Sequence, residues 1–592
     1  MIRRLVRIVP ALVCLSLAGV SMAAPTSKLS TIAEQSGYKR TGRYDEVEKL
    51  CPAFQQAWPG QVRCFEFGRT PEGRPMLALA ASADGTLDAA AARTEQRPVV
   101  LMQGGIHAGE IDGKDAGFLA LREMLEGRAA KNALAHATFV FVPVFSVDGH
   151  ERFGPWNRPN QVGPEEMGWR TNAQNLNLNR DYTKADAPEM HAMLRLLNEW
   201  DPVLYVDLHV TDGAKFEHDV SYNVTPTLAG NSELVRSATG LRDELLKKMT
   251  ALGSLPLDFY PSFVVDDDPQ SGFTDNIGPA WFSQQYWALH NRIGVLVETH
   301  SWKDYPTRVR ITRNSIISMM ELATLHGDEW LKAARAADDR AAKIGGSPVT
   351  LAYGNTDRVT TIEFRGYEYT RQPSAVSGAL MTRYDDKRPQ IWRIPLRNEV
   401  KPVITVTAPK GGYVIPAAYA GWLGEKLALH GVESRVIGQS IAKSPVETFR
   451  ATSAKLSPAT FEGHTRVTID GEWKPDEQSI PAGSLFVPIA QPKAYVAMTL
   501  LEPRDADSYA AWGFFNTSFE RKEYMEAYVA EEVAEEMLKK DPAVKKEFER
   551  RLAEDPAFAQ SPAARLDFFY QRSPSWDARF NLYPVYRTAN SL

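Results

Sequence analysis

The sequence contains little cysteine and no surplus of positive charge. Three cysteines occur in 592 residues, and the formal net charge is −5, with a pI of about 6.2. A nucleic-acid-binding protein would show a clustered basic face, which this charge balance does not indicate. The sequence has no internal repeat and no long low-complexity stretch. After the first residues it also has no segment apolar enough to span a membrane.

The first residues have the pattern of an export signal. Arg3, Arg4 and Arg7 precede a short apolar run over residues 8–20, and small residues follow at positions 21–24. The apolar run is shorter than the ~20 residues of a membrane span, and it contains Pro10. We therefore predict a signal peptide over residues 1–23, a secreted or periplasmic mature protein, and no membrane association after signal removal.

Two of the three cysteines, Cys51 and Cys64, lie beyond the predicted signal peptide. Disulfides persist in exported proteins, and these two residues are the only possible pair in the mature chain. We predict a disulfide between them; the alternative is two buried free thiols.

Residues 40–330 have the pattern of an α/β domain. Apolar runs predict strands at 98–102, 138–144, 203–208 and 293–297, and apolar residues at helical spacing predict a helix over 113–127. Strands that alternate with helices favour a mixed, mostly parallel sheet with helices on both faces.

The pattern changes beyond about residue 335. Alternating residues predict strands at 360–370, 391–396 and 403–407, and residues 417–430 predict a helix. We predict a smaller β-rich accessory domain over 345–500. Residues 519–559 are rich in Glu, Lys, Ala and Leu, with breaks near Asp541-Pro542 and Asp555-Pro556. We therefore predict a helical C-terminal region over 510–592.

A histidine and a glutamate three residues apart follow the first predicted strand. They are His107 and Glu110, in the segment Gly-Gly-Ile-His-Ala-Gly-Glu that begins at residue 104. Catalytic zinc takes three protein ligands, often two His and one Glu, and leaves one position for water. An H-x-x-E pair is common, however, and by itself it indicates only a polar turn.

Two further apolar runs end in ionisable residues. His209 follows the run 203–208, and Glu298 follows the run 293–297. An ionisable group in such a place needs a partner or a task, and in open α/β sheets ligands bind at the carboxyl ends of strands. Three strand ends would thus bring an H-x-x-E pair, a His and a Glu to one edge of the sheet. Asp207 and Asp212 flank His209 and could orient it.

With these motifs, residues 40–325 resemble the zinc carboxypeptidase family, the carboxypeptidase A-like metallopeptidases. The family has an H-x-x-E motif, a third ligand about a hundred residues later, and a catalytic glutamate on a later core strand. An Asn-Arg pair and a Trp-Arg pair are also typical of it, and residues 179–180 and 169–170 match them. The resemblance implies one Zn²⁺ per chain, held by His107, Glu110 and His209.

The resemblance also implies roles for four other residues. Glu298 would take a proton from the attacking water and pass it to the leaving amine. Arg170 would stabilise the oxyanion, and Asn179 and Arg180 would bind the terminal carboxylate of the substrate. The implied activity is zinc-dependent removal of C-terminal amino acids from peptides, with a peptide as partner and no nucleic acid.

Alternatives to this activity are a related zinc amide hydrolase, acting on cell-wall peptides or acylated amino acids, and a non-catalytic binding protein on the same fold. Gly109 stands where the family often has an arginine, and Asn177 where it often has an acid that orients a zinc histidine. For the family's mobile substrate-binding tyrosine, Tyr260 and Tyr286 are candidates. No residue pattern specifies an oligomeric state.

Overall fold

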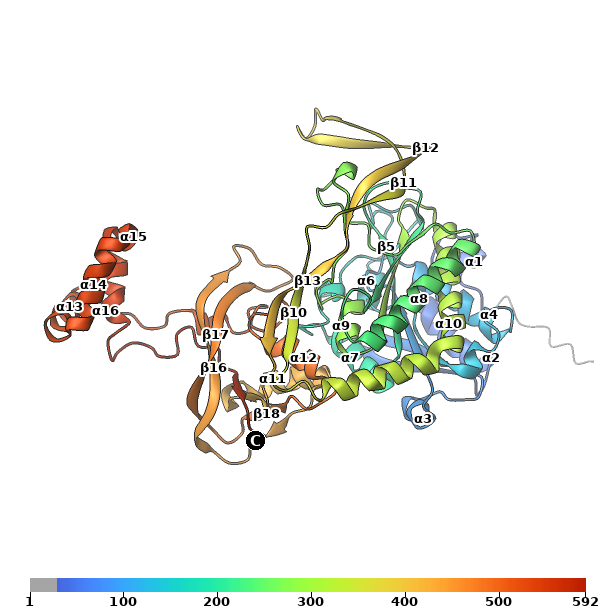
Figure 1. Ribbon diagram of the computed structural model, residues 1–592. Coiled ribbons are helices and arrows are strands. Elements are labelled where there is room, and N and C mark those ends of the chain that lie inside the picture. Colours follow the sequence, from blue (N-terminus) through green and yellow to red (C-terminus); the bar gives the residue numbers. More distant parts are fainter. Residues whose placement is uncertain (1–28) are drawn as a thin grey trace, which may run out of the picture.

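The computed structural model describes residues 29–592, so the predicted signal peptide lies outside the described residues. A large α/β region, a β-rich region with a long hairpin, and a helical arm follow one another along the chain (Figure 1). Within residues 29–592, no helix has both the length and the apolar character that a bilayer crossing requires.

An eight-stranded mixed sheet forms the centre of the α/β region, in the order β1-β2-β4-β3-β5-β9-β6-β7. The four central strands β4, β3, β5 and β9 are parallel, and β1, β2 and β6 are added in antiparallel pairings. Strands buried on both faces explain the continuous apolar runs of the sequence. The strands are β1 (Val62–Arg69), β2 (Pro75–Ala81), β3 (Val99–Gly104), β4 (Thr138–Val142), β5 (Leu204–Thr211), β6 (Val220–Thr225), β7 (Pro256–Leu257) and β9 (Ile293–His300).

Helices cover both faces of this sheet. Trp287 of α9 packs edge-on against Tyr205 of β5, whereas Gly113 of α4 lies against Leu208 of the same strand. Because residues 205 and 208 point to opposite faces of a strand, α4 and α9 lie on opposite sides. The helices are α1 (Ile32–Gln35), α2 (Tyr44–Ala57), α3 (Ala89–Thr94), α4 (Asp112–Leu125), α5 (Ala133–His136), α6 (Val147–Glu151), α7 (Pro188–Trp200), α8 (Ser232–Ala251), α9 (Ser283–Leu289) and α10 (Tyr305–Ala341).

Two of the central strands continue further than their apolar runs. β5 ends at Thr211 and β9 at His300, so His209 and Glu298 lie inside the strands and not just beyond them. The reason is the pairing of β6 with β9, which continues as far as Val220 and Thr299 and keeps the end of β9 extended. In the β5–β9 ladder His209 is the register partner of Glu298.

The predicted disulfide is confirmed. Cys51 of α2 and Cys64 of β1 are joined, with an S–S distance of 2.06 Å. The bond ties the first long helix to the edge of the sheet.

The β-rich region begins after α10. β10 (Pro348–Asn355) pairs with β13 (Val400–Thr407), and between them β11 (Thr360–Pro373) and β12 (Leu380–Arg397) form a long hairpin that projects from the body (Figure 1). A six-stranded sheet follows, in the order β15-β18-β14-β19-β16-β17. Its elements are β14 (Gly412–Ile415), α11 (Ala417–Leu429), β15 (Arg435–Val436), β16 (Ile441–Leu456), β17 (Val467–Ile480), β18 (Leu485–Pro488) and α12 (Ala494–Leu501).

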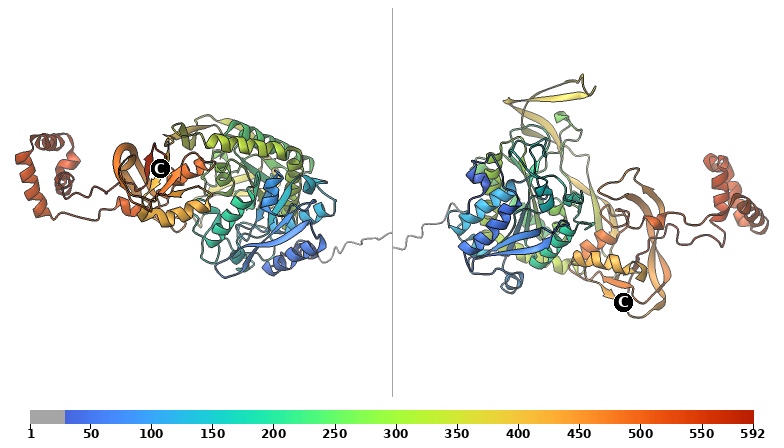
Figure 2. Two further views of the ribbon diagram at one scale, coloured as in Figure 1. Left: turned by 90° about the horizontal axis from the view of Figure 1, so that it is seen from below. Right: turned by 180° about the vertical axis from the view of Figure 1, so that it is seen from behind.

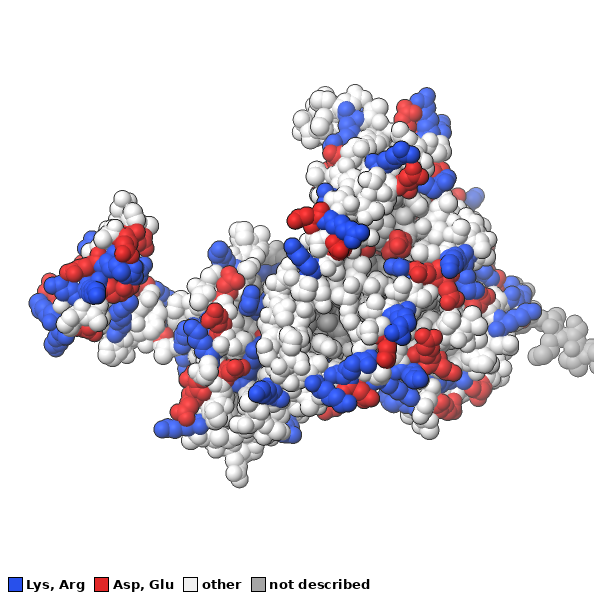
Figure 3. Space-filling view, viewed as in Figure 1, with Lys and Arg blue, Asp and Glu red and all other residues white. Residues whose placement is uncertain are grey.

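The C-terminal part of the chain forms a helical arm and then returns to this sheet. Helices α13 (Ala527–Lys540), α14 (Pro542–Glu554), α15 (Pro556–Gln560) and α16 (Pro562–Tyr570) stand away from the body in each view (Figures 1 and 2). Asp541 and Asp555 cap α14 and α15 at the two Asp-Pro breaks. Lysines, arginines and acids are interspersed on the visible face of the arm (Figure 3). Strand β19 (Tyr586–Thr588), inside the region predicted to be helical, pairs with β14.

Candidate metal centre and active-site cavity

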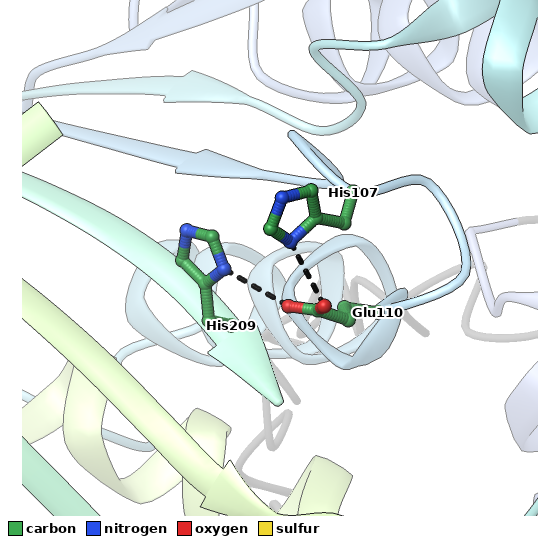
Figure 4. Close-up of side chains that lie close together, drawn as sticks. All are labelled: His107, Glu110 and His209. Atoms are coloured by element: carbon green, nitrogen blue, oxygen red, sulfur yellow. Dashed lines mark hydrogen bonds and ion pairs between the residues drawn. The ribbon is translucent and has the colours of Figure 1, made fainter. Parts of the chain in front are cut away.

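His107, Glu110 and His209 converge at the carboxyl edge of the central strands (Figure 4). His107 and Glu110 lie between β3 and α4, and His209 lies on β5. His107 Nδ1 lies 2.9 Å from Oε1 of Glu110, and His209 Nδ1 lies 2.9 Å from Oε2 of the same carboxylate. One ligand atom from each residue lies within 4.8 Å of the others, and all three residues are buried. Two imidazoles and a carboxylate that face one point form the donor set of a catalytic zinc site, with room for a fourth ligand.

The remaining ring nitrogen of each histidine faces a polar side chain. His107 Nε2 lies 3.1 Å from Asn177 Oδ1, which accepts the imidazole N–H. His209 Nε2 lies 2.9 Å from Asp207 Oδ2, a charge contact without good hydrogen-bond alignment. Such partners fix the ring orientation and leave Nδ1 free for a metal. Asp207 thus faces His209 as expected, whereas Asp212 pairs with Arg158 instead.

The surroundings of the three candidate ligands shift their pKa values in different directions. Burial lowers the pKa of His107 to about 4, which leaves the imidazole neutral. Burial would also lower the pKa of His209, but Asp207 and Glu110 outweigh it and raise that pKa well above its usual value. For Glu110, burial is outweighed by His107 and Arg158, which hold the pKa well below the usual range. A neutral His107 and an ionised Glu110 are in the protonation states that bind a metal ion.

Glu298 lies on β9 beside the three candidate ligands. Its side chain is buried, and Oε2 has no hydrogen-bond partner within residues 29–592. Burial raises the pKa of Glu298 to about 8; His209 opposes the shift, and the nearby acids Glu110 and Asp212 add to it. A carboxyl group with a raised pKa is suited to proton transfer near neutral pH.

A cavity of about 370 Å³ joins Glu298 and the three candidate ligands to the predicted substrate-binding residues. Arg170, Asn179 and Arg180 all line it. Arg180 stacks on the ring of Phe282 at 4.6 Å and forms no ion pair with an acid of the described chain. Arg170 lies 3.9 Å from Glu110 Oε1 and forms no closer ion pair there. The cavity therefore presents two arginines that can receive an anion.

The loop that carries these arginines is held by buried polar contacts. Asn172 Oδ1 accepts the backbone N–H groups of Gln174 and Leu176, and Asn172 Nδ2 lies 3.2 and 3.1 Å from the two carboxylate oxygens of Glu189 on α7. Burial raises the pKa of Glu189 to about 7, an effect that the Asn172 hydrogen bond opposes. Asn172 therefore connects the arginine loop to the protein core.

Comparison with known proteins identifies the family of this region. The family model "Zinc carboxypeptidase" matches residues 47–254, which include the three candidate ligands. Residues 47–254 therefore match the zinc carboxypeptidase family.

Curated relatives match over short segments. The chain is 29% identical over 113 residues to carboxypeptidase 2 of Trichophyton rubrum, which is 19% of this chain and 20% of that protein. It is 27% identical over 179 residues to carboxypeptidase D of Drosophila melanogaster, 28% of this chain and 12% of that protein. The chain thus spans a fifth or less of these two relatives' lengths.

Solved structures align with about half of the chain. A metallo-carboxypeptidase from Burkholderia cenocepacia aligns with a TM-score of 0.35 and 16% identity, over 47% of this chain and 70% of that chain. A metallo-carboxypeptidase from Pseudomonas aeruginosa aligns with a TM-score of 0.34 and 14% identity, over 48% and 69%.

The space beside Gly109, the position at which the sequence comparison with the family expected an arginine, is filled by another part of the chain. A Cβ at Gly109 would lie 2.6 Å from Cγ of Arg158 and 2.7 Å from the carbonyl oxygen of Gly168. Arg158 Nη2 lies 2.9 Å from Glu110 Oε1 and 3.0 Å from Asp212 Oδ1. Arg158 was not among the residues predicted from the sequence, where the only signal for it was the small residue at position 109.

The two tyrosine candidates differ in their position relative to the cavity. Tyr260 lines the cavity, and its hydroxyl group lies 3.1 Å from Thr211 Oγ1. Tyr286 is buried away from the cavity, with its hydroxyl group 2.8 Å from His430 Nδ1. Of the two, only Tyr260 is placed to contact a substrate.

Proposed function

We propose that the chain is a zinc metallocarboxypeptidase that removes C-terminal amino acids from peptides. The observation that carries this proposal is the cavity itself. Glu298, the His107–Glu110–His209 cluster, Arg180 without an ion-pair partner in the described chain, and Arg170 with one long contact to Glu110 line one space of about 370 Å³. An arginine fork binds a carboxylate in a bidentate manner, so a free peptide C-terminus fits this end of the cavity.

His107, Glu110 and His209 would hold the zinc ion. Zinc bound by such a set lowers the pKa of water toward about 7 and polarises a carbonyl group. Glu298 Oε2, which has no hydrogen-bond partner in the described chain, would take a proton from the attacking water. It would then donate that proton to the departing amine.

Arg170, Asn179 and Arg180 would bind the substrate. Arg170 lies close to Glu110, so its guanidinium group can donate to the oxygen that becomes negative during attack. Arg180, stacked on Phe282, would bind the terminal carboxylate together with Asn179. A carboxylate fixed in this way orients the last peptide bond relative to Glu298.

A secreted or periplasmic location agrees with the Cys51–Cys64 disulfide, because disulfides form and persist in oxidising compartments.

The test compares peptides that differ only at their C-terminus. Zinc-loaded protein should release the last residue of a peptide with a free carboxylate and should leave its C-terminal amide uncut, as followed by mass spectrometry. Equal cleavage of both would instead favour a zinc amide hydrolase that does not recognise the terminal carboxylate. No cleavage of any peptide by zinc-loaded protein would refute the proposed activity.

A further inference from the structure

The active-site cavity continues into a second cavity of about 280 Å³, whose wall includes a residue from the β-rich region. Asp212, Tyr260 and Ser262 line both cavities. Phe263, Asp266 and Tyr384 are among the residues that line only the second. Tyr384 lies on β12 of the projecting hairpin, more than a hundred residues after the other five. The cleft is therefore built partly by a segment outside residues 47–254, the region that the family model matches.

The hairpin is fixed to the active-site loops by both strand pairing and side-chain packing. Leu396 and Arg397 of β12 pair with β8 (Phe273–Thr274). Trp392, almost fully buried, packs in one cluster with Phe273 and Phe364. This attachment places the hairpin firmly against the loop that carries Tyr260 and Ser262.

Polar contacts hold the same loop nearer the hairpin tip. The backbone N–H of Thr382 donates to Asp267 Oδ2 at 2.9 Å, and Arg371 Nη1 lies 2.8 Å from Asp268 Oδ2. Tyr384, between these contacts and Trp392, thus has a defined position in the wall of the second cavity.

The carboxylate-binding residues and the second cavity lie at opposite ends of the cleft. Leu296 and Glu298 point to the same face of β9 and both line the active-site cavity. Arg180 stacks on Phe282, which immediately precedes α9, and Gln284 at the start of α9 lies against Gly294 near the beginning of β9. The carboxylate-binding end therefore lies toward the beginning of β9. The second cavity begins at Asp212, just beyond the end of the parallel strand β5.

We propose that the second cavity binds the residues of the peptide on the N-terminal side of the bond that is cut. The proposal rests on the proposed carboxypeptidase function. A peptide held by its carboxylate at Arg180, with its last bond at Glu298, extends its preceding residues toward Asp212 and Tyr384. The hairpin thus makes the enzyme selective for peptides longer than a dipeptide.

Charge in the second cavity points to a preference for basic residues in that part of the peptide. Asp212 is paired with Arg158 and Asp267 with a backbone N–H, but Asp266 has no hydrogen-bond or ion-pair partner within residues 29–592. The hydroxyl group of Tyr384 is buried without a partner in the same part of the chain. An upstream lysine or arginine would find a carboxylate there, and an upstream glutamate would be repelled.

The experiment uses zinc-loaded full-length protein and peptides that share one C-terminal residue. For the parent protein, kcat/KM should rise about tenfold from the dipeptide to the tetrapeptide, the size of one or two net hydrogen bonds. Among tetrapeptides, lysine in place of glutamate at the two upstream positions should raise kcat/KM about fivefold, as for an exposed ion pair.

Two variants and a matched control assign these effects to the hairpin cavity. Asp266→Asn should reduce the lysine-to-glutamate ratio toward one, and Tyr384→Ala should reduce the ratio of tetrapeptide to dipeptide. Asp385→Asn is the control, because Asp385 adjoins Tyr384, lies 3.5 Å from Arg388 and does not line the cavity. Tyr384→Phe keeps the ring, so it separates loss of the hydroxyl group from a loss of hairpin packing.

The results distinguish this proposal from the proposed function. Cleavage of dipeptides and tetrapeptides at equal rates, without an upstream preference, would overturn the extended cleft and leave the carboxypeptidase function standing. If Asp266→Asn and Tyr384→Ala give the same rate ratios as Asp385→Asn, the hairpin cavity has no role in peptide selectivity. An absence of cleavage for every free peptide would refute the proposed function itself.

Discussion

Two buried glutamates, one in each large region of the molecule, have opposite surroundings. In the β-rich region, Glu502 accepts hydrogen bonds from the hydroxyl group of Tyr413, from Trp473 Nε1 at 3.1 Å and from Arg587 Nε at 2.9 Å. In the α/β region, Glu298 has one carboxylate oxygen without any hydrogen-bond partner in the described chain.

From this difference we infer that the paired carboxyl group has a structural role and the unpaired one a chemical role. A buried carboxylate that is fully paired joins parts of the core. A buried carboxylate without donors is costly unless a metal, a water or a substrate completes it. Glu298 lies beside the candidate metal ligands and in one cavity with Arg170 and Arg180, so we expect a bound cation and substrate to complete its environment.

The largest expected effect comes from removing one of the candidate metal ligands beside Glu298. His209→Ala removes one of three candidate ligands and leaves Glu110 and His107 with an incomplete set. We expect loss of tight zinc binding and of activity, measured by metal analysis and peptide hydrolysis. His191→Ala is a control, since the His191 imidazole bonds the carbonyl oxygen of Ala185 and is not one of the candidate ligands. Full zinc occupancy in the His209 variant would disprove its assignment as a ligand.

Removing the charge of Glu502 tests the structural side of the comparison. Glu502→Gln leaves Arg587, whose Nη2 lies 2.6 Å from Glu502 Oε2, buried without a charged partner. The free energy of unfolding should fall by about 3–5 kcal/mol, as for a broken buried pair, in denaturant titration. Zinc content and kcat of the folded variant should stay at the parent values. A loss of kcat without a loss of stability would reverse the roles of the two glutamates.

Replacing Arg158 tests whether a side chain that contacts a candidate metal ligand affects zinc affinity. Arg158→Met keeps most of the aliphatic part of the side chain, which lies over Gly109, and removes the contacts with Glu110 and Asp212. Zinc affinity, measured by chelator competition, should weaken about 10–100-fold. Arg152→Met is a matched control, because Arg152 stacks on Trp169 and contacts no candidate ligand. Equal zinc affinity in both variants would contradict this role for Arg158.

The smallest expected effect concerns Glu189, whose pKa is raised from 4.5 to about 7, with burial as the largest cause. The folded protein binds more protons than the unfolded chain between these values, so this group lowers stability as pH rises through that window. The free energy of unfolding of Glu189→Gln, relative to that of the parent, should therefore increase by about 2 kcal/mol between pH 4.5 and pH 7. A constant difference across this range would show that Glu189 does not titrate there.

The sequence predicted the central sheet and the positions of the site better than it predicted the rest of the cleft. The apolar runs before His209 and Glu298 are local signals, and burial of parallel strands on both faces produces them directly. Arg158 and Tyr384 reach the cleft only through tertiary packing, and no local pattern marks them. The extension of β9 to His300 likewise depends on its pairing with β6, a contact between distant segments.

The most direct test of the account is the rate of peptide hydrolysis by Glu298→Gln, measured with zinc content and melting temperature on the same sample. Glutamine keeps the size of the side chain but cannot accept the proton from water. We expect kcat to fall by at least about 10²-fold, as for a positioned acid–base group, with zinc content and fold preserved. A folded, zinc-loaded Glu298→Gln protein that hydrolyses peptides at nearly the parent rate would contradict the account.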